Sequence, residues 1–518
     1  MRLAELVATS RAVGETSGRL QKIGRLAALL RNVPATELEM AIAFLSGSAR
    51  QGRIGIGGAA INQAREAPPS ETATLDLADV DAAFERIATH AGAGSAGAKA
   101  GILRDLLRRA TRDEQDFLVR LLFGELRQGA LEGVLLEAVA RAWEIAPARL
   151  RRAAMFAGAL APVAAAAMTG GDSALDAFVV RPFQPVRPML AGSAADVDQA
   201  VRELGEASLE YKLDGARIQV HKVDDEVRVY SRSLRDVTGA VPEVVETARA
   251  IPAREIILDG EAVALRHDGT PHPFQTTMRR FGRRLDVEGL QTTLPISPVF
   301  FDCLYLDGDP LIDQPLSRRA GTLAELMPSS LIVPRLETAS LEQAAAFARR
   351  AVAMGHEGVM AKAVDGLYAA GHRGHAWLKV KRARTLDLVV LAAEWGSGRR
   401  VGTLSNLHLG ARDTERGGFV MLGKTFKGLT DAMLAWQTER ILALEAGRDQ
   451  HTVYVRPELV VEIAFNDIQE SPRYPGRLAL RFARVKRYRP DKTPAESDTF
   501  DTIRAIFRQT TGLEPPAR

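Results

Sequence analysis

A lysine flanked by acidic residues is the feature of this sequence best suited to chemistry. Glu210 lies two positions before Lys212, and Asp214 lies two positions after it. A neutral lysine amine is a nucleophile, and nearby cations or a metal can lower the pKa that keeps it protonated. Gly215 lets the backbone approach a ligand, and Arg217 can hold a phosphate or a carboxylate. The run therefore indicates covalent catalysis by Lys212; a surface lysine at a turn is the alternative.

The residues around this run predict the element that carries Lys212. Residues 218–223 alternate between apolar and polar side chains in the manner of a β-strand, and an amphipathic segment precedes the run. We therefore expect Lys212 to open a β-strand in the wall of a pocket.

Further motifs follow this run along the chain, and they contain charged or aromatic side chains suited to nucleotide contacts. They are Ser-Arg-Ser-Leu at 231–234, Leu-Asp-Gly-Glu at 258–261, Phe-Phe-Asp-Cys-Leu-Tyr at 300–305, Glu-Gly-Val-Met-Ala-Lys at 357–362, Trp-Leu-Lys-Val-Lys at 377–381, Leu-Arg-Phe-Ala-Arg at 480–484 and Arg-Pro-Asp-Lys at 489–492. In order and spacing the series resembles the nucleotidyltransferase motifs of ATP-dependent DNA ligases. In that family the lysine of the first motif takes an AMP group from ATP.

The resemblance implies a role for individual residues. Lys212 would attack the α-phosphorus of ATP, with pyrophosphate leaving roughly in line. The residues implied to contact the nucleotide are Glu210, Arg217, Arg232, Glu261, Phe301, Arg373, Lys379 and Lys381. Magnesium would be held by Glu357, with Glu261 as a second candidate, because this ion takes hard oxygen ligands and keeps several waters.

Strand periodicity narrows two of these assignments. Neighbouring strand residues face opposite sides, so one of Phe300 and Phe301 is expected in the core and the other in the pocket. The family register assigns Phe301 to the pocket, where an aromatic face can stack on adenine. Lys379 and Lys381 share one strand face, so both can point at the α-phosphate. Two lysines on a solvated strand edge are the alternative, which fits poorly beside Trp377.

Length and pattern predict a multidomain fold. A chain of 518 residues is too long for one ordinary core and agrees with about three domains. We expect an all-α DNA-binding domain over residues 1–185 and an α+β nucleotidyltransferase (adenylation) domain over 186–385. Short strands punctuated by glycine predict a C-terminal β-barrel of the OB fold over 386–518.

Local periodicity supports this division. Helical spacing joins Leu20, Ile23, Ala27 and Leu30, and again Leu103, Leu106 and Leu107. Residues 227–231, 255–259 and 386–391 are strand-like, and residues 341–353 are expected to form a helix. Residues 153–169 are apolar but mostly alanine and contain a proline, so we expect a buried helical pair there and not a membrane span.

Composition limits the class of protein. With 46% hydrophobic and 25% charged residues, the chain is expected to be soluble and globular. Its single cysteine, Cys303, excludes internal disulfides and a cysteine-rich zinc module, and it fits a reducing cytosol. The net charge of +4 comes from 68 basic and 64 acidic residues, and the pI is near 9.2. Nucleic-acid binding would therefore depend on local basic patches.

The helical region also resembles a part of the larger ligases. Residues 122–130 are similar to the DNA-binding domain that precedes the catalytic core, where glycines let helix ends approach a phosphate backbone and Arg127 adds charge. An ordinary helix–turn–helix joint is the alternative. Because the nucleotide residues named above all lie after residue 186, we expect the pocket to be complete without this region.

The C-terminal basic cluster has two interpretations. It consists of Arg481, Arg484, Lys486, Arg487, Arg489 and Lys492. It could be a solubilising face. The resemblance instead implies that it orients the triphosphate while the lysine is charged and then swings away so that DNA can dock. Ala483 stands where many relatives carry proline, a change expected to alter loop stiffness more than chemistry.

The resemblance implies an ATP-dependent DNA ligase. Lys212 would take AMP from ATP, AMP would pass to the 5′-phosphate of a nick, and the 3′-hydroxyl would displace it. The implied partners are ATP and nicked duplex DNA, with no membrane, for a monomer that encircles DNA in the cytoplasm at the nucleoid. The expected processes are DNA replication, repair or recombination.

Three other functions were weighed against this one. An RNA ligase or a capping-type nucleotidyltransferase shares the chemistry, but the long helical region and the complete last motif argue against it. A non-catalytic DNA clamp is disfavoured by the intact Lys212, Glu261, Glu357, Lys379 and Lys381. An NAD-dependent ligase would need a four-cysteine zinc module, which one cysteine cannot build.

Overall fold

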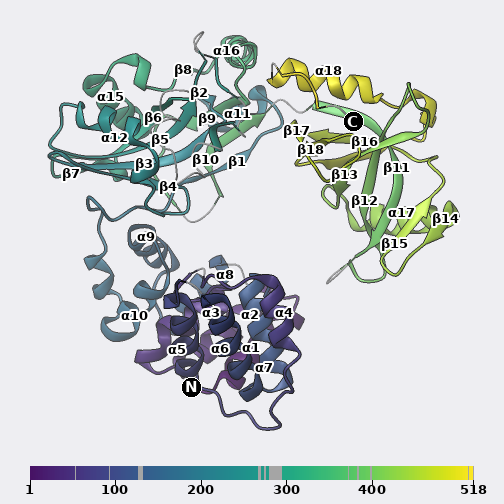
Figure 1. The fold of residues 1–518 in the computed structure, drawn as a ribbon. Helices are drawn as coiled ribbons and strands as arrows, with labels where there is room; N and C mark the ends of the chain where they lie inside the picture. The colour runs from purple at the N-terminus through teal and green to yellow at the C-terminus, as the bar shows by residue number, and fades with distance from the viewer. Residues whose placement is uncertain are drawn as a thin grey trace.

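The N-terminal third of the chain is helical. The structure, a computed structural model, describes residues 1–52, 54–92, 94–126, 132–266, 270–272, 276–278, 294–370, 373–381, 384–396, 400–511 and 513–516. The helices before residue 178 are α1 (Leu3–Glu15), α2 (Arg19–Arg31), α3 (Leu38–Ser46), α4 (Gly58–Arg65), α5 (Leu77–Thr89), α6 (Ser95–Arg109), α7 (Arg112–Phe123), α8 (Glu132–Ala142), α9 (Pro147–Ala157), α10 (Ala161–Gly170) and the 3₁₀ turn η2 (Ser173–Ala177). In Figure 1, α9 and α10 lie between the other helices and the central sheets.

Capping and apolar spacing explain these helices. Helix α7 begins at a capping box in which Thr111 and Glu114 satisfy each other's backbone amides, and it ends at Gly124, whose φ is 69°. In α2 the predicted apolar face is buried except for Leu20, which is 75% exposed. The apolar segment 153–169 forms the end of α9 and most of α10, the expected helical pair. Among the described helices, none has the length and apolar character needed to cross a bilayer.

Two five-stranded sheets form the central region. The first has the order β1-β10-β9-β2-β8 and the second β4-β3-β5-β6-β7. The strands are β1 (Leu190–Ser193), β2 (Ala207–Lys212), β3 (Ala216–Val223), β4 (Glu226–Ser231), β5 (Glu255–Ala264), β6 (Ile296–Leu306), β7 (Asp309–Pro310), β8 (Arg335–Thr338), β9 (Gly358–Ala363) and β10 (Arg373–Lys381). The accompanying helices are α11 (Val197–Leu204), α12 (Pro242–Arg249), α15 (Leu316–Leu326) and α16 (Leu341–Ala353), the last with the bounds predicted.

The chain passes from one central sheet to the other immediately after Lys212. Strand β2 belongs to the first sheet and β3 to the second, so residues 213–215 bridge them. A Cβ atom at Gly215 would lie 2.4 Å from the carbonyl oxygen of Ala262, which explains why only glycine fits this crossing. The first motif is therefore placed between the two sheets.

The C-terminal region is built around one long strand, β11 (Arg384–Trp395), which pairs with β12 along one edge and with β15 and β16 along the other. The further strands are β12 (Leu404–Arg412), β13 (Phe419–Thr425), β14 (Glu445–Arg448), β15 (Thr452–Val455), β16 (Val460–Phe465), β17 (Asp467–Glu470), β18 (Leu478–Arg481) and β19 (Arg484–Tyr488). Two helices, α17 (Asp431–Ala443) and α18 (Phe500–Thr511), pack against them.

The C-terminal region is OB-like, but the predicted closed barrel is not seen. Within the described residues β13 pairs only with β12, and β19 pairs only with β16. The described strand pairs therefore form an OB-like sheet without a pair that closes it, and the closed barrel stays a prediction. Strand β11 also crosses the boundary predicted near residue 385, and the domain boundaries themselves stay predictions.

Candidate active site

A cavity of about 870 Å³ lies between the two central sheets. It is lined by strands of both sheets. Eight of the predicted site residues line it: Glu210, Lys212, Arg217, Arg232, Glu261, Phe301, Lys379 and Lys381. Glu357 lies beside it through its contact with Lys212. Arg373 begins β10, but its side chain lies outside the described part of the structure.

Lys212 ends a strand, whereas the sequence predicted that it opens one. It is the last residue of β2, where it pairs with Gly358 of β9, and its carbonyl accepts a hydrogen bond from the Glu357 amide at 3.2 Å. The alternation used for the prediction belongs to β3. Strand β2 gave no such signal, because its first five residues are all buried and do not alternate.

The amine of Lys212 is paired with a carboxylate that a second lysine shares. Its Nζ lies 2.5 Å from Oε2 of Glu357, and Lys381 contacts the other oxygen, Oε1. Burial would raise the pKa of Glu357, but the charges and hydrogen bonds of Lys212 and Lys381 outweigh it and hold that pKa below its usual range. Glu357 is thus an ionised acceptor between two ammonium groups.

Two further carboxyl groups near Lys212 are harder to ionise. Burial raises the pKa of Glu261 to about 7, although the charges of Lys212 and Arg217 oppose the shift. Burial also raises the pKa of Asp214, and the negative charge of Glu357 adds to this shift. Burial therefore makes both of these carboxyl groups easier to protonate than exposed ones.

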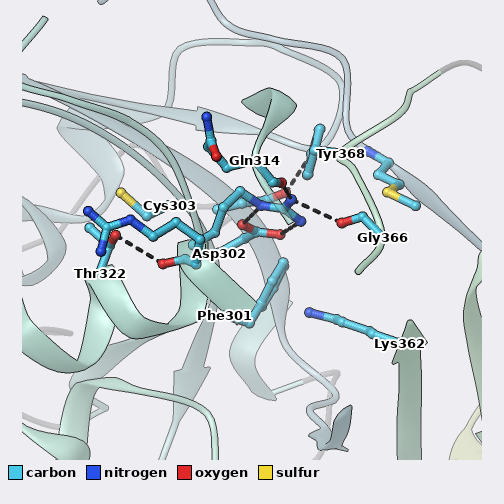
Figure 2. A network of polar contacts seen from close by, with 12 residues as sticks. Phe301, Asp302, Cys303, Gln314, Thr322, Lys362, Gly366 and Tyr368 are labelled. Carbon is cyan, nitrogen blue, oxygen red and sulfur yellow. Dashed lines mark hydrogen bonds and ion pairs between the residues drawn. The ribbon is translucent and has the colours of Figure 1, made fainter. Parts of the chain in front are cut away.

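The opposite end of the cavity is a closed network around Glu210. Its side chain is 2% exposed and lies 2.5 Å from both Arg335 Nη2 and Lys362 Nζ. The ammonium of Lys362 lies 4.5 Å from the centroid of the Phe301 ring and 4.2 Å from that of Trp377. Figure 2 shows the end of the Lys362 side chain directed toward Phe301. These contacts place a buried carboxylate beside an aromatic surface.

The sequence did not identify all of this network. Lys362 lies in a quoted motif, at its last position, but no role was assigned to it. Arg335 lies 125 residues from Glu210 along the chain, in β8, and no motif contains it. Only the antiparallel pairing of β2 with β8, which puts Glu210 opposite Arg335, could have found it.

Arg217 contacts a carboxylate of the protein. It donates two hydrogen bonds to Asp259, at 3.0 and 2.6 Å, and one to the Met189 carbonyl at 2.7 Å. Although burial opposes it, the charge of Asp259 raises the pKa of Arg217 above its usual value. The guanidinium carbon lies 5.5 Å from the Phe301 ring centroid. Arg217 therefore supports the aromatic wall with one face and reaches the cavity with another part of its side chain.

The alternation along two strands is as predicted. Phe301 lines the cavity, where its ring meets Trp377 edge-on at 6.1 Å, while Phe300 is fully buried in the core. Lys379 and Lys381 line the cavity together with Trp377, as expected of residues two apart on β10. Their proposed contacts with a nucleotide stay predictions.

The C-terminal basic cluster does not enter the cavity. Within the described residues, none beyond Lys381 lines it. Arg489 and Lys492 instead pair with Asp387, at 3.0 and 2.6 Å, and Arg487 pairs with Glu462. One member of the cluster does come near the site, because the charge of Arg481 opposes the rise that burial causes in the pKa of Asp214. The C-terminal region also reaches the site through a residue that the sequence did not indicate: the Asn466 amide lies 3.4 Å from Glu357 Oε1.

Comparison with known proteins agrees with this arrangement. Three family models match the chain: the ATP dependent DNA ligase domain over residues 188–381, the ATP dependent DNA ligase C terminal region over 400–492, and the DNA ligase N terminus over 58–140. A "Probable DNA ligase" of Anaeromyxobacter sp. (strain Fw109-5) is 60% identical over 516 residues, which is 99% of each chain. The chain belongs to the ATP-dependent DNA ligase family.

Two other relatives of this ligase also align with nearly its whole length. A "Probable DNA ligase" of Sorangium cellulosum is 55% identical, covering 98% of this chain and 95% of that one. One of Mycobacterium marinum is 52% identical, covering 98% and 100%. The solved structure "Pmar-Lig_PreS3" is 18% identical and covers 93% of this chain and 99% of that chain with a TM-score of 0.63, so it supports the fold.

Proposed function

We propose that this ligase seals nicks in duplex DNA in three steps. Lys212 takes AMP from ATP, the AMP passes to the 5′-phosphate at the nick, and the 3′-hydroxyl then displaces AMP. The observation that carries the proposal is a single cavity whose two ends suit different parts of ATP. The end with Phe301 and Glu210 suits a base, and the end with the paired Lys212 carries further cations that suit phosphates.

The base end, which is the part of the cavity around Glu210 and Phe301, suits adenine. The ring of Phe301 offers a face for stacking, and Glu210 offers carboxylate oxygens that accept hydrogen bonds but do not donate them. The exocyclic amine of adenine is a donor, whereas guanine has a carbonyl at the same position. The ion pairs with Lys362 and Arg335 hold Glu210 in place, which supports a preference for ATP over GTP.

At the reacting end, which is the part of the cavity around Lys212 and Glu357, the lysine must lose its proton before it can attack. Lys212 is held in an ion pair with Glu357, so the pair must separate before the amine attacks. Lys381 contacts the same carboxylate and can hold it when Lys212 leaves. Lys379 and Lys381 then face the phosphate that receives the attack, where positive charge stabilises the developing negative charge.

The acidic groups near Lys212 fit a magnesium ion. Burial raises the pKa of Glu261 to about 7 and also raises that of Asp214, and a bound cation would favour both charged forms. Glu357 and Glu261 would hold the ion, which would neutralise charge on the phosphate oxygens. Among the described residues, no group of three or more such side chains could hold a metal, and magnesium commonly relies on water and substrate phosphates as well.

Several finer features belong to the same proposal. They are a closed OB barrel in the C-terminal region, a monomer that encircles nicked DNA, and a cytoplasmic location at the nucleoid. The basic cluster that contains Arg489 and Lys492 would orient the triphosphate in the first step. Its separation from the cavity supports a movement of the C-terminal region between steps, because its cations now pair with Asp387.

The decisive experiment follows the label of α-labelled ATP. Incubation with magnesium should attach label to the protein, and the addition of nicked duplex DNA should transfer it and yield sealed strands. RNA ends offered in parallel test the RNA ligase alternative. Labelled protein that seals RNA ends but not nicked DNA would contradict the proposal, and so would a protein that never becomes labelled.

A further inference from the structure

Helix α9 packs one face against the other N-terminal helices and another face against residues of the central sheets, which form the adenylation region. Leu150, Ala153 and Ala154 are buried among the other helices. Met155 and Phe156, which are 3% and 2% exposed, belong instead to a cluster with residues of the central sheets. The partners in that cluster include Met189, Ile257, Leu304, Ile312, Tyr368, Ala370 and Trp377.

Polar contacts hold this helix against the central region. Arg152 donates two hydrogen bonds to Asp313, at 2.5 and 2.6 Å. The backbone amide of Ala370 lies 3.2 Å from the sulfur of Met155, and the Arg187 amide donates to the Met155 carbonyl at 2.9 Å. The position of α9 is therefore set by contacts on both sides of the apolar cluster.

The cluster behind α9 is continuous with the wall of the nucleotide cavity. Met189 and Trp377 belong to the cluster and also line the cavity. Tyr368 donates a hydrogen bond to Asp259 at 2.7 Å and accepts one from the Met189 amide at 3.0 Å. Asp259 in turn holds Arg217, which lies over the Trp377 ring at 5.7 Å. A shift of Tyr368 or Trp377 would thus move the surface that faces the base.

A second network of hydrogen bonds holds residues 366–370, the segment that contains Tyr368, on the side away from α9. Arg319, which is fully buried, binds Asp302 through two nitrogens and donates to the Gly366 carbonyl at 3.1 Å. Figure 2 shows Asp302, Gly366 and Tyr368 around this network, with dashed lines for its hydrogen bonds. Residues 366–370 are therefore held by the adenylation region on one side and by α9 on the other. Only the α9 side comes from another domain.

We propose that α9 supports the rear wall of the nucleotide pocket from behind, and that Met155 and Phe156 are positioning residues for ATP. They act through Tyr368 and Trp377, and the inference rests on the proposed use of ATP in the first step. As the sequence led us to expect, every described residue that lines the cavity follows residue 186, and α9 contacts this lining from behind. Close packing transmits the loss of a buried side chain to its neighbours, because interiors contain few voids that could absorb it.

The test measures self-adenylation without DNA. Met155→Ala and Phe156→Ala are each expected to raise the KM for ATP about tenfold, equivalent to about 1.4 kcal/mol, with little change in kcat. Leu150→Ala is the matched control, since it removes a buried side chain from the same helix on the face that packs in the helical core. Its KM should equal that of the wild type. The conservative Met155→Leu should restore most of the affinity.

A surface ion pair provides a second test that spares the core. Arg152 and Asp313 are both about half exposed. Arg152→Asp and Asp313→Arg, as single changes, should each raise the KM for ATP two- to threefold, roughly the worth of an exposed pair, and the double exchange should restore it. ATP should also raise the Tm of the Met155 and Phe156 alanine variants less than that of the wild type.

The outcomes separate this inference from the proposed function. Wild-type protein that takes no label from ATP would refute the proposed function. If the wild type is labelled normally but Met155→Ala and Phe156→Ala match Leu150→Ala in KM, the inference about α9 is wrong. Alanine variants too unstable to assay leave the charge exchange to decide, and single exchanges with unchanged KM would overturn the proposal.

Discussion

The two ends of the cavity differ in how deeply their ion pairs are buried. At the base end, Glu210 is 2% exposed and is paired with both Arg335 and Lys362. At the reacting end, Lys212 and Glu357 are 20% and 17% exposed. A closed buried network favours a single geometry, whereas partly exposed ion pairs exchange partners at lower cost. The surface proposed to read the base is therefore fixed, and the groups proposed to react can change partners during the transfer of AMP.

The largest expected effect comes from the removal of the nucleophile at the reacting end. Lys212→Ala should abolish labelling by α-labelled ATP, because no other step forms the lysyl–AMP bond. It should still seal a nick that already carries AMP on its 5′-phosphate, since the last step needs no lysine nucleophile. Gel detection of protein label and of sealed strands measures the two steps. Persistent labelling of the variant would contradict the assignment of Lys212.

The base end should respond to the loss of a single charge. Glu210→Gln leaves Arg335 and Lys362 without a charged partner, and breaking a buried pair in this way costs about 3–5 kcal/mol. We expect the KM for ATP to rise about a hundredfold, or about 2.7 kcal/mol, and the preference for ATP over GTP to fall. Glu337→Gln, an exposed change on the neighbouring strand β8, is the matched control. An unchanged ATP/GTP ratio would show that Glu210 only supports the fold.

The distance along the chain between contacting residues explains which site residues the sequence could predict. Residues within a motif were found because their spacing is local: Lys379 and Lys381 share a strand face, and Phe301 is the cavity-facing member of its pair. Arg335 reaches the site only through strand pairing, and such long-range pairing leaves no local pattern. The same applies to Met155, which lies on α9 and meets the residues of the central sheets only through tertiary packing.

The elements themselves were predicted with uneven success. The helix over 341–353 has a regular apolar face and a serine cap, so its bounds were clear. Strand β2 was missed as the carrier of Lys212 because it is buried nearly throughout and gives no alternation. A closed barrel could not be read from short strands, since closure depends on which edges meet, and that is set by tertiary packing.

A smaller effect should come from the second lysine at the reacting end. Lys381→Met removes one of the two cations on Glu357, so Glu357 pairs with Lys212 alone and retains the nucleophile more firmly. We expect kcat for self-adenylation to fall about tenfold, or about 1.4 kcal/mol, with a smaller change in KM. Single-turnover labelling at saturating ATP measures this step. A raised KM with unchanged kcat would mean that Lys381 contributes to ATP binding alone.

The last expected effect concerns the charge of Glu261 and is an effect on stability, with no change in the rate of labelling required. Burial raises its pKa from 4.5 to about 7, so between these values the folded protein binds a proton that the unfolded chain releases. Its contribution to stability is therefore full below pH 4.5 and is lost as the pH rises through 7. Without magnesium, the wild type should lose at most about 3 kcal/mol more than Glu261→Gln between pH 5 and pH 8.

Thermal unfolding without magnesium measures this difference. The Tm of Glu261→Gln should exceed that of the wild type by more at pH 8 than at pH 5, and Glu342→Gln, an exposed change on α16, should show no such trend. Added magnesium should reduce the gap at pH 8, because the cation binds the charged carboxylate of the wild type and stabilises it. A gap that is the same at both pH values would mean that Glu261 is already charged in the folded protein. Glu261 would then carry the same charge at both pH values, and burial would not make this carboxyl harder to ionise.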